Sequence, residues 1–376
     1  MKQLCSLNNF LTEYNEKNID NRYRPVAVGR YGIRTRESIY SKELAKDYSK
    51  NKLIYKNTLT VGMGSVQIDI GILTDDVVFS VSPAYHTYKV TGINSEYLRY
   101  CLECRNQDMF VRYVKRGSRQ GKTIDLKRWL TYEIPVYDDD MQAEIVDKLD
   151  RVASLINNHQ QQLQKLDELV KSRFIELFGD PVSNQHGYEK VSLSELADIK
   201  IGPFGSLLHK EDYIEGGHPL LNPSHIVDGK IAPDNKLSIS ENKYSELSAY
   251  QLHVGDVVMG RRGEMGRCAV VPDEGYLCGT GSLMIRTKGD VTADYIQKVI
   301  SFPSFKKTIE DMAVGQTMPN LNVPIVSSFQ IIKPPIEVQN RYYAFVAQVD
   351  KSKLAVQQGL EKLETLKKSL MQQYFG

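Results

Sequence analysis

Long apolar runs, paired cysteines and a strong net charge are all missing from this sequence of 376 residues. No apolar stretch approaches the roughly 18 residues of a membrane-spanning helix, which argues against an integral membrane protein. The five cysteines are an odd number without a paired framework, which suits a reducing compartment, so we expect a cytoplasmic protein. A net charge of +2 excludes a uniformly basic protein that coats nucleic acid.

Metal-binding and catalytic motifs are scarce as well. The seven histidines are scattered, without an H-x-x-x-H or H-E-x-x-H pattern. Cys101 and Cys104 form a C-x-x-C without a second pair, whereas a structural zinc needs four ligands, so we interpret them as buried thiols. We therefore expect no metal, no cofactor and no catalytic residue on this chain.

Two short phrases resemble enzyme motifs but lack their surroundings. SPAY at 82–85 is similar to the base-holding box of amino-methyltransferases, but VGMGS at 61–65 lacks the G-x-G-x-x-G spacing of a methyl-donor turn. PD at 233–234, followed by ENK at 241–243, spells a nuclease-like pattern in a loop-like stretch. Such short patterns arise by chance, and neither predicts a catalytic site.

What the sequence does have is an internal repeat. Residues 142–179 align without a gap on residues 339–376 at an offset of 197, and ten of the last twenty positions are identical. Upstream the offset barely drifts, because residues 94–98 fall on 292–296 at an offset of 198. This period is far longer than the roughly 20–50 residues of solenoid repeats, so the chain is a duplication of one unit.

The repeated segment is predicted to be a long helix. Its apolar positions alternate in steps of four and three with no Gly or Pro before Gly179 and Pro181, which indicates a coiled-coil seam. The seam of the first copy is Ile145, Leu149, Val152, Ile156, His159, Leu163, Leu166, Val170, Arg173 and Leu177. The weaker seam of the second copy, with two lysines, is Tyr342, Val346, Val349, Lys353, Val356, Leu360, Leu363, Lys367, Leu370 and Tyr374. Two separate core helices are the alternative, but globular helices average only about 11–12 residues, so we favour pairing.

The segments between the helices indicate mixed structure, and the chain is predicted to be an α+β protein. Helices are expected at 95–114 and 293–312. Their β-branched and aromatic content predicts short strands within 55–63, 77–90, 130–137, 250–260, 268–272, 282–287 and 328–335.

Positive charge gathers in local clusters. Residues 22–36 hold five Arg and two Tyr with no acid, residues 112–128 are rich in Lys and Arg, and residues 260–267 place three Arg among three Gly. Each cluster could be an ordinary solvated face. In the register of the repeat, however, residues 260–267 correspond to a loop near 61–67. Equivalent loops of the two copies therefore contain different residues. That combination is typical of a duplicated reader of two different targets.

Arginine, glutamine and asparagine are the usual readers of base edges, whereas Lys and Arg on phosphates fix position without specifying sequence. The loop at 117–123 corresponds to the loop at 314–320 in the same register. The candidate DNA-binding residues are Arg30, Arg34, Arg36, Arg116, Arg119, Lys122, Lys210, Arg261, Arg262, Arg267 and Gln316.

Several phrases in a fixed order carry a family resemblance. EIPVYDDDMQAEI (133–145) and IIKPPIEVQNR (331–341) each lead from a strand through a turn and a Gln into a long helix. ELFGDPVSNQHGYEKVSLSELADI (176–199), GPFGSLLHKEDYIEGGHPLL (202–221) and VSPAYHTYKV (81–90) supply domain boundaries and strands. Over essentially its whole length the chain resembles the specificity subunits of type I restriction-modification systems. VYDDDMQ departs from the family pattern because it lacks the usual second proline.

The resemblance implies a molecule with pseudo-two-fold symmetry. Target recognition domains would occupy 1–141 and 180–338, and spacer helices at 142–179 and 339–376 would pair as an antiparallel coiled coil. Each domain would read one half of a bipartite DNA sequence, and the helices would set the unread spacer.

The resemblance also implies partners. These are double-stranded DNA, two methylation subunits and restriction–translocation subunits, which would bind S-adenosylmethionine, ATP and magnesium, so that none of these cofactors belongs to this chain. A stand-alone DNA-binding or structural adaptor of another defence complex is the main alternative. A fused single-chain enzyme is disfavoured because no catalytic motif was found.

Overall fold

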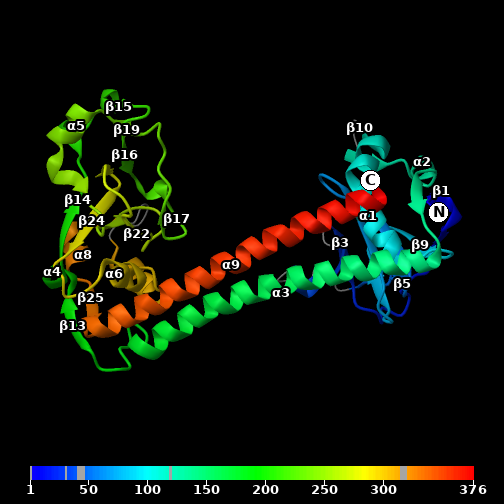
Figure 1. Ribbon diagram of the computed structural model, residues 1–376, viewed down its shortest axis with the longest axis horizontal. Helices are drawn as coiled ribbons and strands as arrows, with labels where there is room; N and C mark the ends of the chain where they lie inside the picture. Colours follow the sequence, from blue (N-terminus) through cyan, green and yellow to red (C-terminus); the bar gives the residue numbers. More distant parts are fainter. Residues whose placement is uncertain (1, 30–31, 40–46, 118–120, 314–319) are drawn as a thin grey trace. The chain divides into compact units, whose positions relative to one another are not determined.

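The computed structural model describes residues 2–29, 32–39, 47–117, 121–313 and 320–376. It divides into two compact units, the first formed by Met1–Gln162 and Ala355–Gly376 and the second by Leu163–Leu354. Each unit therefore contains a continuous stretch of chain that carries sheets, together with a segment of each of two long helices (Figure 1).

The first unit is built on an antiparallel sheet of four strands in the order β2-β9-β6-β7. These strands are β2 (Leu11–Tyr14), β9 (His86–Val90), β6 (Thr58–Met63) and β7 (Ile68–Leu73). Helix α1 (Ser95–Tyr113) packs on the sheet, and both contribute to a core that includes the buried Trp129. The other elements are β1 (Gln3–Ser6), β12 (Glu133–Val136), β3 (Val26–Gly29), β4 (Gly32–Thr35), β5 (Lys52–Ile54), β8 (Phe79–Val81), β10 (Val114–Gly117), β11 (Gly121–Ile124) and α2 (Leu126–Trp129).

The second unit repeats this plan. Its four-stranded antiparallel sheet has the order β14-β24-β21-β22, formed by β14 (Ala197–Ile201), β24 (Ser282–Thr287), β21 (Val257–Gly260) and β22 (Cys268–Val270). A ladder of β13 (Glu189–Ser192) with β25 (Gln330–Lys333) corresponds to the β1–β12 ladder of the first unit. The helices are α4 (Leu193–Leu196), α5 (Glu241–Glu246), α6 (Ala293–Ile300), α7 (Pro303–Met312) and α8 (Val323–Ser327).

The units differ most in what is inserted between the strands of the four-stranded sheet. The second unit carries a further sheet of five strands in the order β15-β19-β16-β23-β20. These are β15 (Tyr213–Ile214), β19 (Ser238–Ile239), β16 (His218–Leu221), β23 (Tyr276–Cys278) and β20 (Gln251–Leu252), and a small hairpin of β17 (Ile226–Val227) and β18 (Lys230–Ile231) lies beside them in sequence. Among its described residues, the first unit has the β3–β4 and β5–β8 pairs in the corresponding insertions.

Helices α3 (Asp139–Phe178) and α9 (Ile336–Phe375) are each 40 residues long and begin three residues before the predicted positions. In the first unit, Ile145 and Leu149 of α3 share a core with Phe375 near the end of α9. In the second, Phe178 at the end of α3 meets Tyr342 near the start of α9, with 5.4 Å between ring centroids. The helices thus run antiparallel in both units, which confirms the predicted pairing.

The two lysines of the second seam explain why its sequence pattern is weak. Lys353 donates to Asp167 at 2.6 Å in the second unit, and Lys367 donates to Glu103 of α1 at 3.0 Å in the first. Each ammonium is paired with a carboxylate while its aliphatic stem covers apolar surface. Within the described residues, none of the helices is long and apolar enough to cross a membrane.

One predicted helix is wrong in its extent. The segment 293–312 forms two helices, α6 and α7, which are separated at Ser301 and Phe302. Pro303 occupies the first turn of α7, where its missing N–H is tolerated, whereas within one continuous helix it would remove a hydrogen bond. The corresponding segment of the first unit has no proline and forms the single helix α1.

A buried glutamine fixes the start of each long helix to its own unit. Gln142 accepts a hydrogen bond from Asn94 N at 3.0 Å and donates to Tyr137 O at 2.7 Å. Gln339 accepts from Thr292 N at 2.9 Å and donates to Pro334 O at 2.9 Å. Asn94 and Thr292 cap α1 and α6, so the same clamp occurs at the same place in both copies.

Candidate nucleic-acid interface

The β21–β22 hairpin, which carries three of the predicted arginines, and the β6–β7 hairpin leave equivalent edges of the two four-stranded sheets. In the second unit, Ile201 at the end of β14 pairs with Leu283, and Gly260 at the end of β21 pairs with Ser282 at the start of β24. The segments 202–206, 261–267 and 279–281 therefore emerge at one edge. In the first unit the β6–β7 hairpin loop, residues 64–67, occupies the corresponding position.

The hairpin of the second unit, residues 261–267, holds two of its three arginines in place. Arg261 donates through Nε to Asn320 Oδ1 and Leu321 O, both at 3.3 Å, and burial lowers the pKa of its guanidinium. Arg267 donates to Glu264 at 3.1 and 2.7 Å and to Pro223 O at 3.2 Å. Both side chains therefore anchor the loop to its surroundings.

Arg262 differs from its neighbours because it is exposed. Its backbone forms a bridge with Asn320, and no hydrogen bond of its side chain to another described residue was found. The flanking anchors fix the backbone on either side of it, so a guanidinium group is presented at the sheet edge. The planar guanidinium of Arg262, with its fork of N–H donors, matches a phosphate group or the two acceptors of a guanine.

Glu264 shapes the same hairpin electrostatically. Hydrogen bonds from Arg267 and then from Lys306, which donates at 3.1 Å, lower the pKa of the Glu264 carboxyl. The carboxylate therefore offsets the positive charges of Arg267 and Lys306.

The hairpin of the first unit carries no charge within residues 64–67. Gly64 N donates to Gln67 O at 3.1 Å, and Val66 is 66% exposed. Lys122 of β11 donates through Nζ to Ser65 O and lies 5.4 Å from the centroid of the Phe110 ring. The predicted basic residue Lys122 thus lies beside the equivalent edge, as an extension of the hairpin rather than within it.

The other predicted residues are more widely distributed. Arg34 is exposed on β4, and the guanidinium of Arg36 lies 5.4 Å from the centroid of the Tyr48 ring. Lys210 is exposed in a short helical turn after the 202–206 segment. Arg116 lies on β10, opposite Lys122, and nothing is described of its side chain. Arg30, Arg119 and Gln316 lie outside the described residues.

The SPAY phrase and Cys101 have structural explanations. Tyr85 of SPAY packs over Gly62, where a Cβ would lie 2.3 Å from its ring, and its hydroxyl donates to Val28 O at 2.9 Å. Cys101 is fully buried, and burial raises the pKa of its thiol to about 12. In the part of the chain that the structure describes, no group of three or more His, Cys, Asp or Glu side chains could hold a metal ion.

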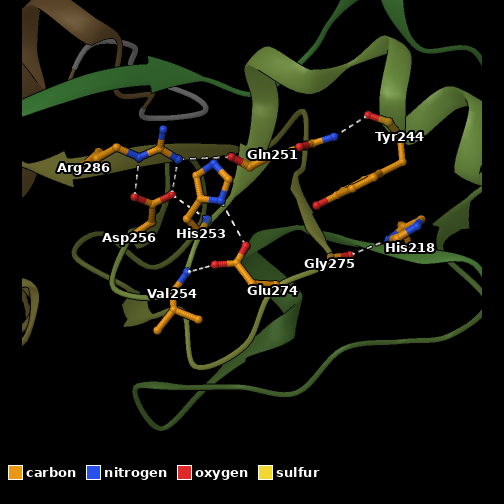
Figure 2. Close-up of polar contacts among 9 residues, drawn as sticks. All are labelled: His218, Tyr244, Gln251, His253, Val254, Asp256, Glu274, Gly275 and Arg286. Atoms are coloured by element: carbon orange, nitrogen blue, oxygen red, sulfur yellow. Dashed lines mark hydrogen bonds and ion pairs between the residues drawn. The ribbon is translucent and has the colours of Figure 1, made fainter.

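A polar network at the opposite edge of the second unit was missed by sequence reasoning. Figure 2 shows Arg286 of β24 donating to both carboxylate oxygens of Asp256, at 2.7 and 2.6 Å, and to Gln251 O at 3.2 Å. Asp256 also accepts from His253 N at 2.8 Å. Because Gln251 belongs to β20, this network ties the five-stranded sheet to the four-stranded one. Its residues are far apart in sequence and form no local motif.

Comparison with known proteins decides the family. The family model described as type I restriction modification DNA specificity domain matches residues 8–168 and again residues 185–367. The chain belongs to this family. It is accordingly a DNA-specificity subunit of a type I restriction-modification system, a subunit that is itself non-catalytic. The double match agrees with the duplication seen in the sequence and in the two sheets.

Solved structures share the fold. The S subunit of a type I restriction-modification system from M. genitalium is 14% identical, with a TM-score of 0.55, over 100% of this chain and 96% of that one. A structure from work on complex assembly and conformational transition of the type I R-M system is 16% identical, with a TM-score of 0.64, over 99% of this chain and 97% of that one.

Proposed function

We propose that this specificity subunit reads a bipartite DNA sequence, with one half-site contacted by the sheet edge of each unit. The observation that carries the proposal is the pair of equivalent hairpins whose loops differ in content, basic at 261–267 and uncharged at 64–67. A conserved frame with different loops allows one architecture to read two sequences. Domain limits of 1–141 and 180–338 for the two readers are part of the same proposal.

The contacts are divided between the half-sites. The first half-site would be contacted by Arg30, Arg34, Arg36, Arg116, Arg119 and Lys122. The second would be contacted by Lys210, Arg262 and Gln316, with Arg261 and Arg267 holding the 261–267 loop in place for that contact. Base contacts by some of these side chains would specify sequence, and phosphate contacts by the others would fix position.

The partners follow from the family. We propose that the paired helices dock two methylation subunits and that restriction–translocation subunits join that complex in the cytoplasm. The internal duplication supports this because it offers two equivalent docking faces. A stand-alone adaptor of another defence complex would need no methylation subunit, and a methyltransferase gene beside this one would disfavour it.

Methylome sequencing of a host that carries the operon tests the proposal. We expect methylated adenines within a split motif of two short sequences separated by a fixed unread spacer. Deleting this gene alone should remove that motif from the methylome. A contiguous motif, or none in an active complex, would contradict bipartite reading.

The spacer can be tested separately. Seven residues inserted between Ile156 and Leu163, with seven more between Lys353 and Leu360, keep both apolar seams in phase. Each helix would lengthen by about 10 Å, or roughly three base pairs of DNA rise. We expect the spacer of the methylated motif to shift by a few base pairs while both half-sites stay the same. An unchanged spacer in an active complex would mean that these helices do not set it.

A further inference from the structure

A large aromatic side chain is exposed at the basic edge of the second unit. Phe204 is 62% exposed, and Leu207 in the same turn is 37% exposed. Single exposed apolar residues are ordinary and need no explanation. The backbone around Phe204, however, is held by hydrogen bonds and by close contacts at glycine, so this exposed side chain has a defined position.

The constraints come from both sides of the ring. Gly202 N donates to Ser282 O at 3.1 Å, and a Cβ at Gly202 would lie 2.1 Å from Gly279 O, so only glycine allows this approach. The hydroxyl of Thr280 donates to Pro203 O at 2.8 Å. Gly205 has a φ of +64°, a conformation that favours glycine. The turn therefore holds Phe204 outward at a defined place.

This turn is connected to the basic hairpin through a shared segment. Thr280 binds Pro203, and the neighbouring Gly281 accepts a hydrogen bond from Arg261 N at 3.1 Å. The exposed Phe204 and the exposed Arg262 thus flank the 279–281 segment at one sheet edge. An apolar ring beside a guanidinium group suits a ligand that has both a polyanionic backbone and apolar faces. DNA has both, whereas an apolar protein surface lacks the negative charge.

We propose that Phe204 is a base-contacting residue of the second half-site, where its ring packs against bases while Arg262 supplies the polar contact. The proposal rests on the bipartite reading proposed above. Apolar side chains contact thymine methyl groups in the major groove or insert between base pairs in the minor groove. Either contact carries sequence information that phosphate binding does not.

The test uses the full chain in complex with the methylation subunit of its own system. Phe204→Ala, Phe204→Trp and the wild type would be compared by selection from a random duplex library and by titration of the wild-type site. Val254→Ala is the matched control, because Val254 is an exposed apolar residue that precedes β21 and so lies at the opposite sheet edge.

We expect Phe204→Ala to weaken binding of the wild-type site about tenfold to a hundredfold and to relax selection in one half-site only. Phe204→Trp should retain most of the affinity, and Val254→Ala should match the wild type. The midpoint of thermal unfolding should not change, since Phe204 is exposed.

Two results would overturn the proposal. One is unchanged affinity and selection in Phe204→Ala, and the other is an equal loss on all sequences, which would indicate a contact with the DNA backbone. Failure of the wild-type complex to select a split site would overturn the bipartite reading and this inference with it. The two failures are therefore distinguishable.

Discussion

The two units share a frame and differ in what they build on it. Both have a four-stranded antiparallel sheet with the same connections, a terminal two-stranded ladder and a glutamine clamp. The second unit adds a five-stranded sheet, tied on through Asp256 and Arg286, where the first has two strand pairs. The two copies share what joins each unit to the helices and differ in the strands inserted into the sheet.

The contacts that tie the inserted strands to each four-stranded sheet differ in chemistry. At the start of β6, Thr58 and Tyr14 share a hydrogen bond of 2.7 Å between hydroxyl groups. Just before β21, Asp256 and Arg286 form a bidentate ion pair instead. The Tyr14 hydroxyl also donates to Leu53 O of β5 at 3.0 Å, so a neutral group links the four-stranded sheet of the first unit to its β5–β8 pair. The larger insertion of the second unit is held by a charged contact, which is the stronger kind.

The largest expected effect comes from breaking the contact that only the second unit has. In Asp256→Ala, the Arg286 guanidinium and the N–H of His253 lose their acceptor in a largely buried place. We expect the free energy of unfolding to fall by about 2–4 kcal/mol, below the full value for a buried pair because the Arg286 side chain is 39% exposed. Hydrogen exchange should show the loss in the second unit only, with the exposed Asp273→Ala as control. Equal loss of protection in both units would contradict this assignment.

The next effect should be the same in both units. Gln142→Ala and Gln339→Ala each remove a buried side chain and leave a backbone N–H and a carbonyl group without the partner that the glutamine supplied. We expect each substitution to lower the free energy of unfolding by about 2–3 kcal/mol. Hydrogen exchange should show the loss in the first unit for Gln142→Ala and in the second unit for Gln339→Ala. Gln160→Ala, at an exposed position of α3, is the control. A large effect at one glutamine only would show that the clamps are not equivalent.

The features that could be predicted from the sequence are those that depend on residues close together in the chain. The seams of α3 and α9 repeat every three or four residues, and the glutamine at each helix start stands in a short recognisable phrase. The Asp256–Arg286 pair could not be predicted, because it joins residues 30 positions apart whose proximity depends on strand order. The functions of Arg261 and Arg267 as loop anchors were hidden for the same reason, since their partners at Leu321 and Pro223 are distant in sequence.

A smaller effect should distinguish Arg262 from Arg267 in the hairpin of the second unit. Arg262→Ala should weaken binding of the target by about 1–3 kcal/mol and relax selection in the second half-site only, because its guanidinium is exposed. Arg267→Ala should instead raise the rate of hydrogen exchange in the loop, because it releases Glu264 and Pro223. Lys122→Ala supplies the comparison in the first unit, where any loss should fall on the first half-site. Unchanged binding and salt dependence in both Arg262→Ala and Lys122→Ala would refute the assignment.

The smallest effect contrasts the two hairpins by pH. Hydrogen bonds from Arg267 and Lys306 lower the pKa of Glu264, so its contribution to stability is present above the unfolded value of about 4.3 and is lost as pH falls through the folded pKa. Burial raises the pKa of Asp69 on β7, so its contribution is present below the unfolded value of about 3.9 and is lost as pH rises through the folded pKa.

Acidification from pH 6 to pH 3.5 should therefore loosen the 261–267 hairpin and tighten the β6–β7 hairpin, each by less than about 1 kcal/mol because both groups are partly solvated. Local hydrogen exchange, corrected for its intrinsic pH dependence, measures both shifts in one sample. Glu264→Gln should abolish the first response and Asp69→Asn the second, while Glu310→Gln, at an exposed position of α7, should change neither. If the stability of both hairpins changes in the same direction, acidification acts on the whole chain. The opposite pKa shifts of Glu264 and Asp69 would then not explain how the two hairpins respond.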